Sequence, residues 1–173
     1  MNEKIIPFPG PKKQESDFQF YLNRAKELLE SNMFLESLEY FELAFLIKPK
    51  NVEVLENLGG LYFNLEDYIK AEEVYGRLLK EDSKSEIYHY FYALSSALNH
   101  KSKQAKDHFL LCLKLNPDFD AAKYELGVLY YTEGNIFEAL KFLKTVKSGH
   151  YVAMAKGIIR KAKDEILSKN EKI

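Results

Sequence analysis

The fold of this chain is decided by residues 52–84, which read VEVLENLGGLYFNLEDYIKAEEVYGRLLKEDSK. Residues three and four apart lie on one face of an α-helix, and the apolar positions here follow that spacing. The first half carries Leu55-x-x-Leu58-Gly59-x-x-Tyr62, and the second half carries Ala71-x-x-x-Tyr75. A small residue where two helices cross, ringed by large apolar side chains, permits close antiparallel packing. The stretch therefore predicts a tight pair of helices.

The same pattern recurs along the chain with a period of 34 residues. If Val52 is the first position of one unit, the others begin at Phe18, Glu86 and Asp120. The small or alanine position of the second helix recurs in phase, at Ser37, Ala71, Ala105 and Ala139. Pro49 and Pro117 each end a helix, because proline cannot continue one, and Asn51 and Asp118 then offer side chains to cap the next helix. Four units in phase predict four helix pairs.

This pattern resembles the tetratricopeptide repeat, whose signature has this order of residues and this period. The resemblance implies an all-α fold, a tetratricopeptide-type α-solenoid. It would be a right-handed superhelix of four helix pairs plus a C-terminal capping helix. We predict repeats at about 18–51, 52–85, 86–119 and 120–149 and a capping helix at 150–169, within a domain spanning 17–169. Residues 1–16 are expected to form an extended, proline-rich tail, and residues 170–173 a short C-terminal tail.

Composition excludes several other classes of protein. The 173 residues suffice for one domain with a real core, and the formal net charge of −1 gives no general attraction to nucleic acid or membranes. The lone Cys112 excludes an intrachain disulfide and is expected to be a buried filler. No stretch is apolar enough to span a bilayer, and no secretory signal is recognisable. We therefore expect a cytoplasmic protein.

The N-terminal segment Ile5–Pro9 combines two isoleucines and a phenylalanine with prolines that favour extended backbone. It is more apolar than a typical disordered tail. Two readings stay open for it: a loose leader, or a segment that docks onto the surface of this protein or of a partner.

The resemblance also indicates where binding would occur, since groove-facing side chains come mainly from the first helix of each repeat. The second half of this groove is apolar and aromatic, which is typical of an interaction site. The predicted peptide-binding residues are Asn57, Phe63, Asn64, Ile87, Tyr90, Phe91, Leu94, Tyr124, Val128 and Tyr131. A stripe of aromatic residues at helical spacing can equally be core, so both readings remain open. The final helix, with Lys156 and Arg160 on its polar face, or the tail, could also fill the groove.

Some tetratricopeptide proteins grip C-terminal carboxylates of chaperone tails with lysine, asparagine and arginine. The matching positions here are Leu22, Lys26, Asn57, Ile87 and Phe91, of which Asn57 alone agrees in kind. A carboxylate clamp is not expected.

The sequence offers no support for catalysis, for a metal site or for a cofactor. The four histidines have no metal-ligand spacing, and there is no phosphate-binding loop or nucleophile elbow. His89 takes a core position, and His108 is expected on the outer side of its helix. Glu72 and Glu73 are expected on a solvated face, and Lys123 occupies a position where an aromatic residue is usual.

The sequence thus predicts a binding protein and not an enzyme. Its leading function is an adaptor or scaffold that holds a peptide or helix of a protein partner, which would be apolar or proline-bearing. The alternatives are a small chaperone that shields an apolar client segment and a structural protein that forms homo-oligomers. Nucleic-acid binding by the C-terminal lysines is a minor possibility, because lysine faces are usually just solvated.

Overall fold

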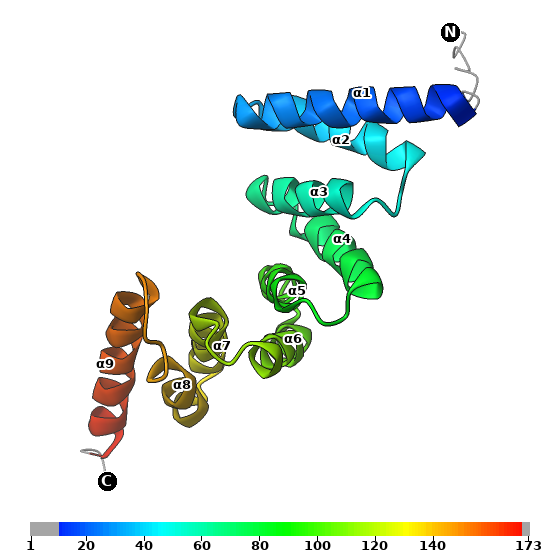
Figure 1. Ribbon diagram of the computed structural model, residues 1–173. Coiled ribbons are helices and arrows are strands. Elements are labelled where there is room, and N and C mark those ends of the chain that lie inside the picture. Colours follow the sequence, from blue (N-terminus) through cyan, green and yellow to red (C-terminus); the bar gives the residue numbers. More distant parts are fainter. Residues whose placement is uncertain (1–10, 171–173) are drawn as a thin grey trace, which may run out of the picture. The chain divides into compact units, whose positions relative to one another are not determined.

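The computed structural model describes residues 11–170, and the side chains of residues 14–168. This part of the chain forms nine α-helices and contains no strand. They are α1 (Pro11–Glu30), α2 (Phe34–Ile47), α3 (Val52–Asn64), α4 (Tyr68–Glu81), α5 (Glu86–Leu98), α6 (Ser102–Leu115), α7 (Asp120–Thr132), α8 (Ile136–Leu143) and α9 (Tyr151–Asn170) (Figure 1). The predicted all-α fold with four helix pairs and a final helix is confirmed. The segment Ile5–Pro9 lies outside the described residues.

Three helix boundaries differ from those predicted. The first helix begins at Pro11, so residues 11–16 are helical and are not part of an extended tail. The physical reason is that proline is well tolerated in the first turn, where its missing N–H has no helical partner. Asp118 does not cap α7, which begins at Asp120; instead the Asp118 N–H donates to the Asn116 side chain at 3.1 Å. The sequence pattern predicts a helix over residues 136–147, but α8 ends at Leu143.

The chain divides into two compact units, with the boundary after Val74 inside α4. In the first unit, α1 packs along α2, and α2 contacts α3 (Figure 1). The α1–α2 core is built from Phe18, Ala25 and Leu28 of α1 with Phe41 and Ala44 of α2, all nearly inaccessible to solvent. The hydroxyl of Ser37 occupies the small-residue position of α2 and donates to the Ala25 carbonyl at 2.8 Å, which ties the two helices together.

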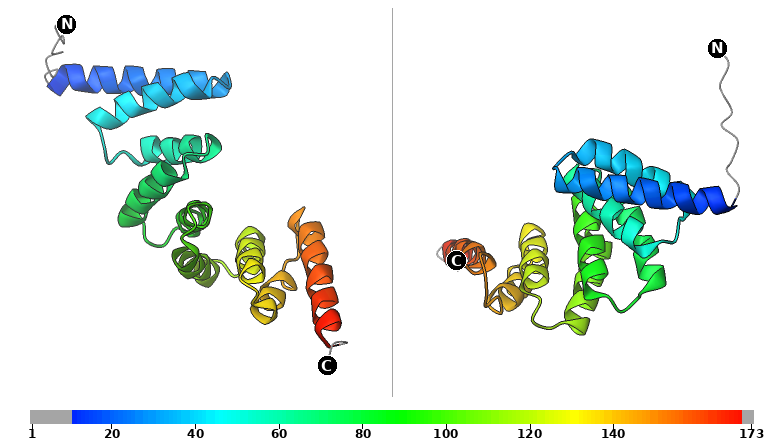
Figure 2. Two further views of the ribbon diagram at one scale, coloured as in Figure 1. Left: turned by 180° about the vertical axis from the view of Figure 1, so that it is seen from behind. Right: turned by 45° about the horizontal axis from the view of Figure 1, so that its top comes forward.

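In the second unit, α5 packs against α6 and α7 against α8, and α9 contacts both α7 and α8. Figure 2 shows these neighbours from two further directions. The first core cluster surrounds Tyr90, Phe109 and Leu126. The second surrounds Tyr124 and Leu143 and is completed by apolar residues of α9. The predicted capping helix therefore exists: Ala155 and Ala162 on its apolar side are buried, Ile158 and Ile159 are half-buried, and its described charged side chains remain exposed.

The turn inside each helix pair has the same geometry in all four repeats. One residue has a positive φ at equivalent positions 34 residues apart, namely Asn32, Glu66, His100 and Gly134. The next N–H then donates back to a carbonyl five residues earlier, for example from Asp67 to Tyr62 at 2.9 Å and from Asn135 to Tyr130 at 2.9 Å. This left-handed residue satisfies carbonyls at the end of the first helix and reverses the chain into the second.

None of the helices in the described part of the chain is both long enough and apolar enough to cross a membrane.

Candidate peptide-binding surface

In the first unit, the predicted binding residues Asn57, Phe63 and Asn64 all lie on α3. The Asn57 amide donates to the Glu53 carbonyl one turn earlier at 2.7 Å, and Asn64 is exposed. The Phe63 ring packs edge-on against Tyr68, with ring centres 5.4 Å apart. This part of the predicted surface is polar, with one partly buried aromatic side chain.

In the second unit, Ile87, Phe91 and Leu94 follow the i, i+4, i+7 spacing of one helical face on α5. Ile87 is 50% exposed, and the other two are half-buried. The Phe91 ring stacks on Tyr75, with ring centres 5.1 Å apart and an angle of 11° between the planes. The described residues therefore leave an apolar face on α5 that is partly open to solvent, and Phe91 in this face packs on Tyr75.

Tyr90 and Tyr124 contribute to the core more than to the surface, because they are only 8% and 9% exposed. Tyr90 contacts the rings of Phe91, Phe109 and Phe119. The Tyr124 ring lies 5.4 Å from that of Tyr151 on α9. Burial raises the pKa of both phenols, so both stay neutral. The structure therefore agrees better with the interpretation of these two tyrosines as core residues than with their interpretation as exposed residues of a groove.

The other predicted residues of the fourth repeat, Val128 and Tyr131, are half-buried and lie next to α9. The Tyr131 hydroxyl donates to the Glu165 carboxylate of α9. The final helix therefore covers part of the predicted surface on α7, as one of the alternatives from the sequence anticipated. Among the predicted binding residues of the second unit, Ile87 on α5 has the most exposed side chain.

Glu125 is a half-buried acidic residue on α7 that sequence reasoning did not single out. Burial raises the pKa of its carboxyl to about 7. It interacts electrostatically with the phenols of Tyr90 and Tyr124, which both belong to the predicted surface. The signal was available in the sequence, since position 125 is equivalent to Asn57 and Phe91 in the preceding repeats.

Asp120 and Lys123 form a buried ion pair that explains the unusual lysine. Lys123 is 6% exposed, and its Nζ lies 2.8 Å from Asp120 Oδ1. The other oxygen of Asp120 accepts hydrogen bonds from the N–H of Lys147 at 3.0 Å and from the N–H and hydroxyl of Ser148 at 2.7 Å each. These bonds hold the segment that follows α8, so the pair organises the approach to α9.

His108 is not on the outer side of its helix, contrary to the prediction. Its Nδ1 lies 3.0 Å from Nδ1 of buried His89, because α5 and α6 pack these two side chains against each other. His89 Nε2 lies 3.2 Å from the Ser83 carbonyl oxygen, so this nitrogen donates to it. The prediction for Glu72 was also wrong, since this side chain is 7% exposed and not solvated.

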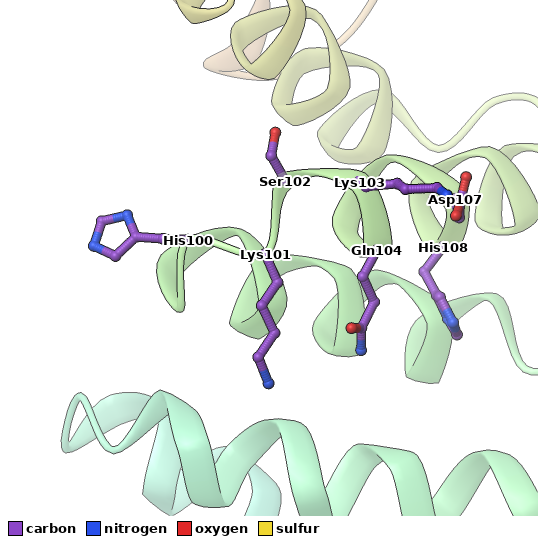
Figure 3. Close-up of a pocket in the computed structure, with 7 residues that line it drawn as sticks. All are labelled: His100, Lys101, Ser102, Lys103, Gln104, Asp107 and His108. Atoms are coloured by element: carbon purple, nitrogen blue, oxygen red, sulfur yellow. The ribbon is translucent and has the colours of Figure 1, made fainter.

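A shallow depression of about 530 Å³ lies at the start of α6. Figure 3 shows that the side chains of Lys101, Gln104 and His108 point to one side of it, and that Ser102 points the other way. Within the described residues there is no group of three histidine, cysteine or acidic side chains that could hold a metal ion. Cys112 is fully buried, as predicted, and burial raises the pKa of its thiol to about 12, so it is not a reactive nucleophile.

Comparison with known proteins identifies the repeat. A family model of the tetratricopeptide repeat matches residues 52–85. No curated protein matches the chain. Among solved structures, that of the MamA protein is 21% identical over 91% of this chain and 94% of its own, with a TM-score of 0.74.

Two further solved structures share the fold. YrrB, described as a tetratricopeptide protein with an unusual peptide-binding site, is 21% identical over 73% of this chain and 65% of its own, with a TM-score of 0.63. A tetratricopeptide repeat protein from Parabacteroides merdae is 16% identical over 87% of this chain and 61% of its own, with a TM-score of 0.75. Residues 52–85 thus match the tetratricopeptide repeat, and the chain shares its fold with solved tetratricopeptide-repeat structures.

Proposed function

We propose that this chain is a protein-interaction scaffold or adaptor that binds a peptide or helical segment of a partner. The observation that carries the proposal is the partly open apolar face of α5, formed by Ile87, Phe91 and Leu94. An apolar face that the described residues leave partly open is typical of an interaction site. Support also comes from YrrB, which shares the fold and is described as having a peptide-binding site.

A peptide that follows this face would contact Ile87 first, because that residue has the most exposed side chain of the three. Half-buried Phe91 and Leu94 then supply a pre-arranged surface, so little side-chain entropy is lost on binding. Val128 and Tyr131 of the same unit remain part of the proposal as further contacts, and Asn57, Phe63 and Asn64 remain a predicted binding surface of the first unit by itself. Tyr90 and Tyr124 would not contact the peptide directly; as buried side chains they would pack beneath the surface residues and keep them in position.

The test is affinity capture of partners from a native extract, followed by binding measurements with Ile87→Asp. A buried aspartate is costly to desolvate, so we expect this variant to bind the captured partner about tenfold more weakly or worse, equal to about 1.4 kcal/mol. The matched control is Phe137→Asp on α8, where the apolar side chain is 79% exposed and lies outside the proposed surface. Unchanged affinity in Ile87→Asp, or an equal loss in both variants, would contradict the proposal.

A second candidate function is self-association or the shielding of apolar client segments. It is favoured by α2, where Leu35 and Leu46 are 64% and 68% exposed and Leu43 is 39% exposed. Light scattering across a range of concentrations separates these readings. A monomer at high concentration excludes a homo-oligomer, and capture of many loosely held proteins in place of one defined partner would favour a chaperone.

A further inference from the structure

The position of Glu125 places a carboxylate beside the proposed binding surface. On α7 it is four residues after Ala121 and three before Val128, so the three residues share one face of the helix. Ala121 packs against the core cluster around Tyr90, and Val128 packs against the cluster around Tyr124. Glu125 therefore lies between two aromatic clusters and is half-buried there.

In the described part of the chain, no cation is paired with this carboxylate. Among the side chains of residues 14–168, none forms a hydrogen bond or an ion pair with Glu125. The titratable groups that interact with it electrostatically are the phenols of Tyr90 on α5 and Tyr124 on its own helix, whose pKa values burial raises, so both are neutral. A carboxylate that has lost part of its hydration without gaining a partner is energetically unfavourable.

Other acidic residues of the same unit differ from Glu125. Asp120 is paired with Lys123 at 2.8 Å, and Glu133 is paired with Lys106 at 2.6 Å. Hydrogen bonds from these lysines help to lower the pKa of each carboxyl, whereas burial without a cation raises the pKa of Glu125 to about 7. The described residues of this unit thus supply cations to Asp120 and Glu133 but not to Glu125, which lies near Tyr90 and Tyr124.

We propose that the partner segment presents a lysine or arginine side chain to Glu125, with apolar residues on either side of that cation. The inference rests on the proposed function and narrows the class of partner. A partner cation would restore favourable electrostatics at a site of low dielectric, where an ion pair is worth more than in water. The neighbouring tyrosine rings would also attract a cation. A partner with an acidic residue at this point would be rejected by like charge.

The experiment uses a library of short peptides without histidine, in which every position samples apolar, acidic and basic residues. The full-length chain, Glu125→Gln and the control Asp107→Asn are each used to select binders, after circular dichroism has shown that all three are folded. Asp107 is an exposed acid on α6, so its change removes the same charge away from the surface. We expect lysine or arginine to be enriched at one position with the wild-type chain and with Asp107→Asn, and the enrichment to vanish with Glu125→Gln.

A selected basic peptide then tests the protonation of Glu125. The basic side chain of the peptide pairs only with an ionised carboxylate. The affinity of the peptide for the wild-type chain should therefore rise about tenfold from about pH 6 to about pH 8, and its affinity for Glu125→Gln should stay constant. Selection of peptides without basic enrichment, or enrichment that survives in Glu125→Gln, would overturn this inference and leave the proposed function standing. Failure to select any peptide would count against the proposed function itself.

Discussion

At the scale of single residues, the stability of the second unit depends on the buried pair of Asp120 and Lys123. Burial opposes ionisation of Asp120, but hydrogen bonds from Lys123, Ser148 and two backbone N–H groups outweigh it and lower the pKa of the carboxyl. A carboxyl whose pKa is lower in the folded chain stabilises the fold above its unfolded pKa of about 3.9, and this stabilisation is lost as the pH falls below it.

We therefore expect Asp120→Ala to lower the free energy of unfolding by about 3 kcal/mol at neutral pH, because Lys123 is left buried without its partner. The loss should shrink as the pH falls below about 4, where the wild-type chain loses the same stabilisation. Urea unfolding at several pH values measures both effects.

The matched control is Asp118→Ala. Asp118 also faces Lys123, at 3.8 Å, but its side chain is 88% exposed, so we expect a change within about 0.5 kcal/mol. If Asp118→Ala cost as much as Asp120→Ala, or if the double variant Asp120→Ala/Lys123→Met were strictly additive, the ion pair would not be the cause.

At the scale of elements, glycine controls how closely α7 and α8 approach. A methyl group added at Gly127 would lie 2.6 Å from Leu143 Cγ and 2.8 Å from Leu143 Cδ2. Leu143 itself is 1% exposed and is enclosed by the core, so it has little room to move. Gly127 is therefore required for packing, as the leucine–glycine pair in the repeat pattern suggested. Gly157 on α9 has no neighbouring atom within 4 Å of such a methyl group.

These two glycines should respond in opposite directions to the same substitution. We expect Gly127→Ala to destabilise the chain by about 2 kcal/mol through overpacking. Gly157→Ala should stabilise it by about 0.5 to 1 kcal/mol, because alanine favours the helix and meets no obstacle. Thermal and chemical unfolding of the two variants measure the difference, and a stabilised Gly127→Ala would show that α8 can shift to make room.

At the scale of the whole molecule, the stack of repeats needs a terminal element with one apolar and one polar side. The helix α9 has this character: Ala155 and Ala162 are 2% and 0% exposed, and the neighbouring charged residues Lys156 and Lys161 are exposed. It covers Tyr124, Leu143 and Val146 of the fourth repeat.

Removal of α9 should consequently lower the free energy of unfolding by at least about 3 kcal/mol, since each apolar side chain exposed costs about 1.5 to 3 kcal/mol, and should promote aggregation. Calorimetry and light scattering provide the measurements. Two point variants distinguish the effect of lost packing from the effect of a shorter chain, because both keep the full length. Ala162→Glu, at a buried position, should be strongly destabilising, and Lys161→Glu, at an exposed position, should be nearly neutral. A shortened chain as stable as the full one would show that α9 is dispensable.

The sequence alone determined the helix pairs, their period and their turns in outline. These features depend on local spacing: apolar residues three and four apart, a glycine or small residue at each crossing, and prolines that end helices. The early start of α1 was missed for a local reason too, because a proline read as a helix breaker is also a favourable first residue of a helix.

Only the tertiary structure decided which side chains stay open to a partner. Tyr90 and Tyr124 follow the groove pattern yet lie in the core, while Glu125 is half-buried and pairs with no cation among the described residues. His108 faces His89, and Lys123 is enclosed beside Asp120. Spacing along one helix specifies a face, but burial, charge pairing and exposure depend on what the neighbouring helices place against that face, and those neighbours are distant in sequence.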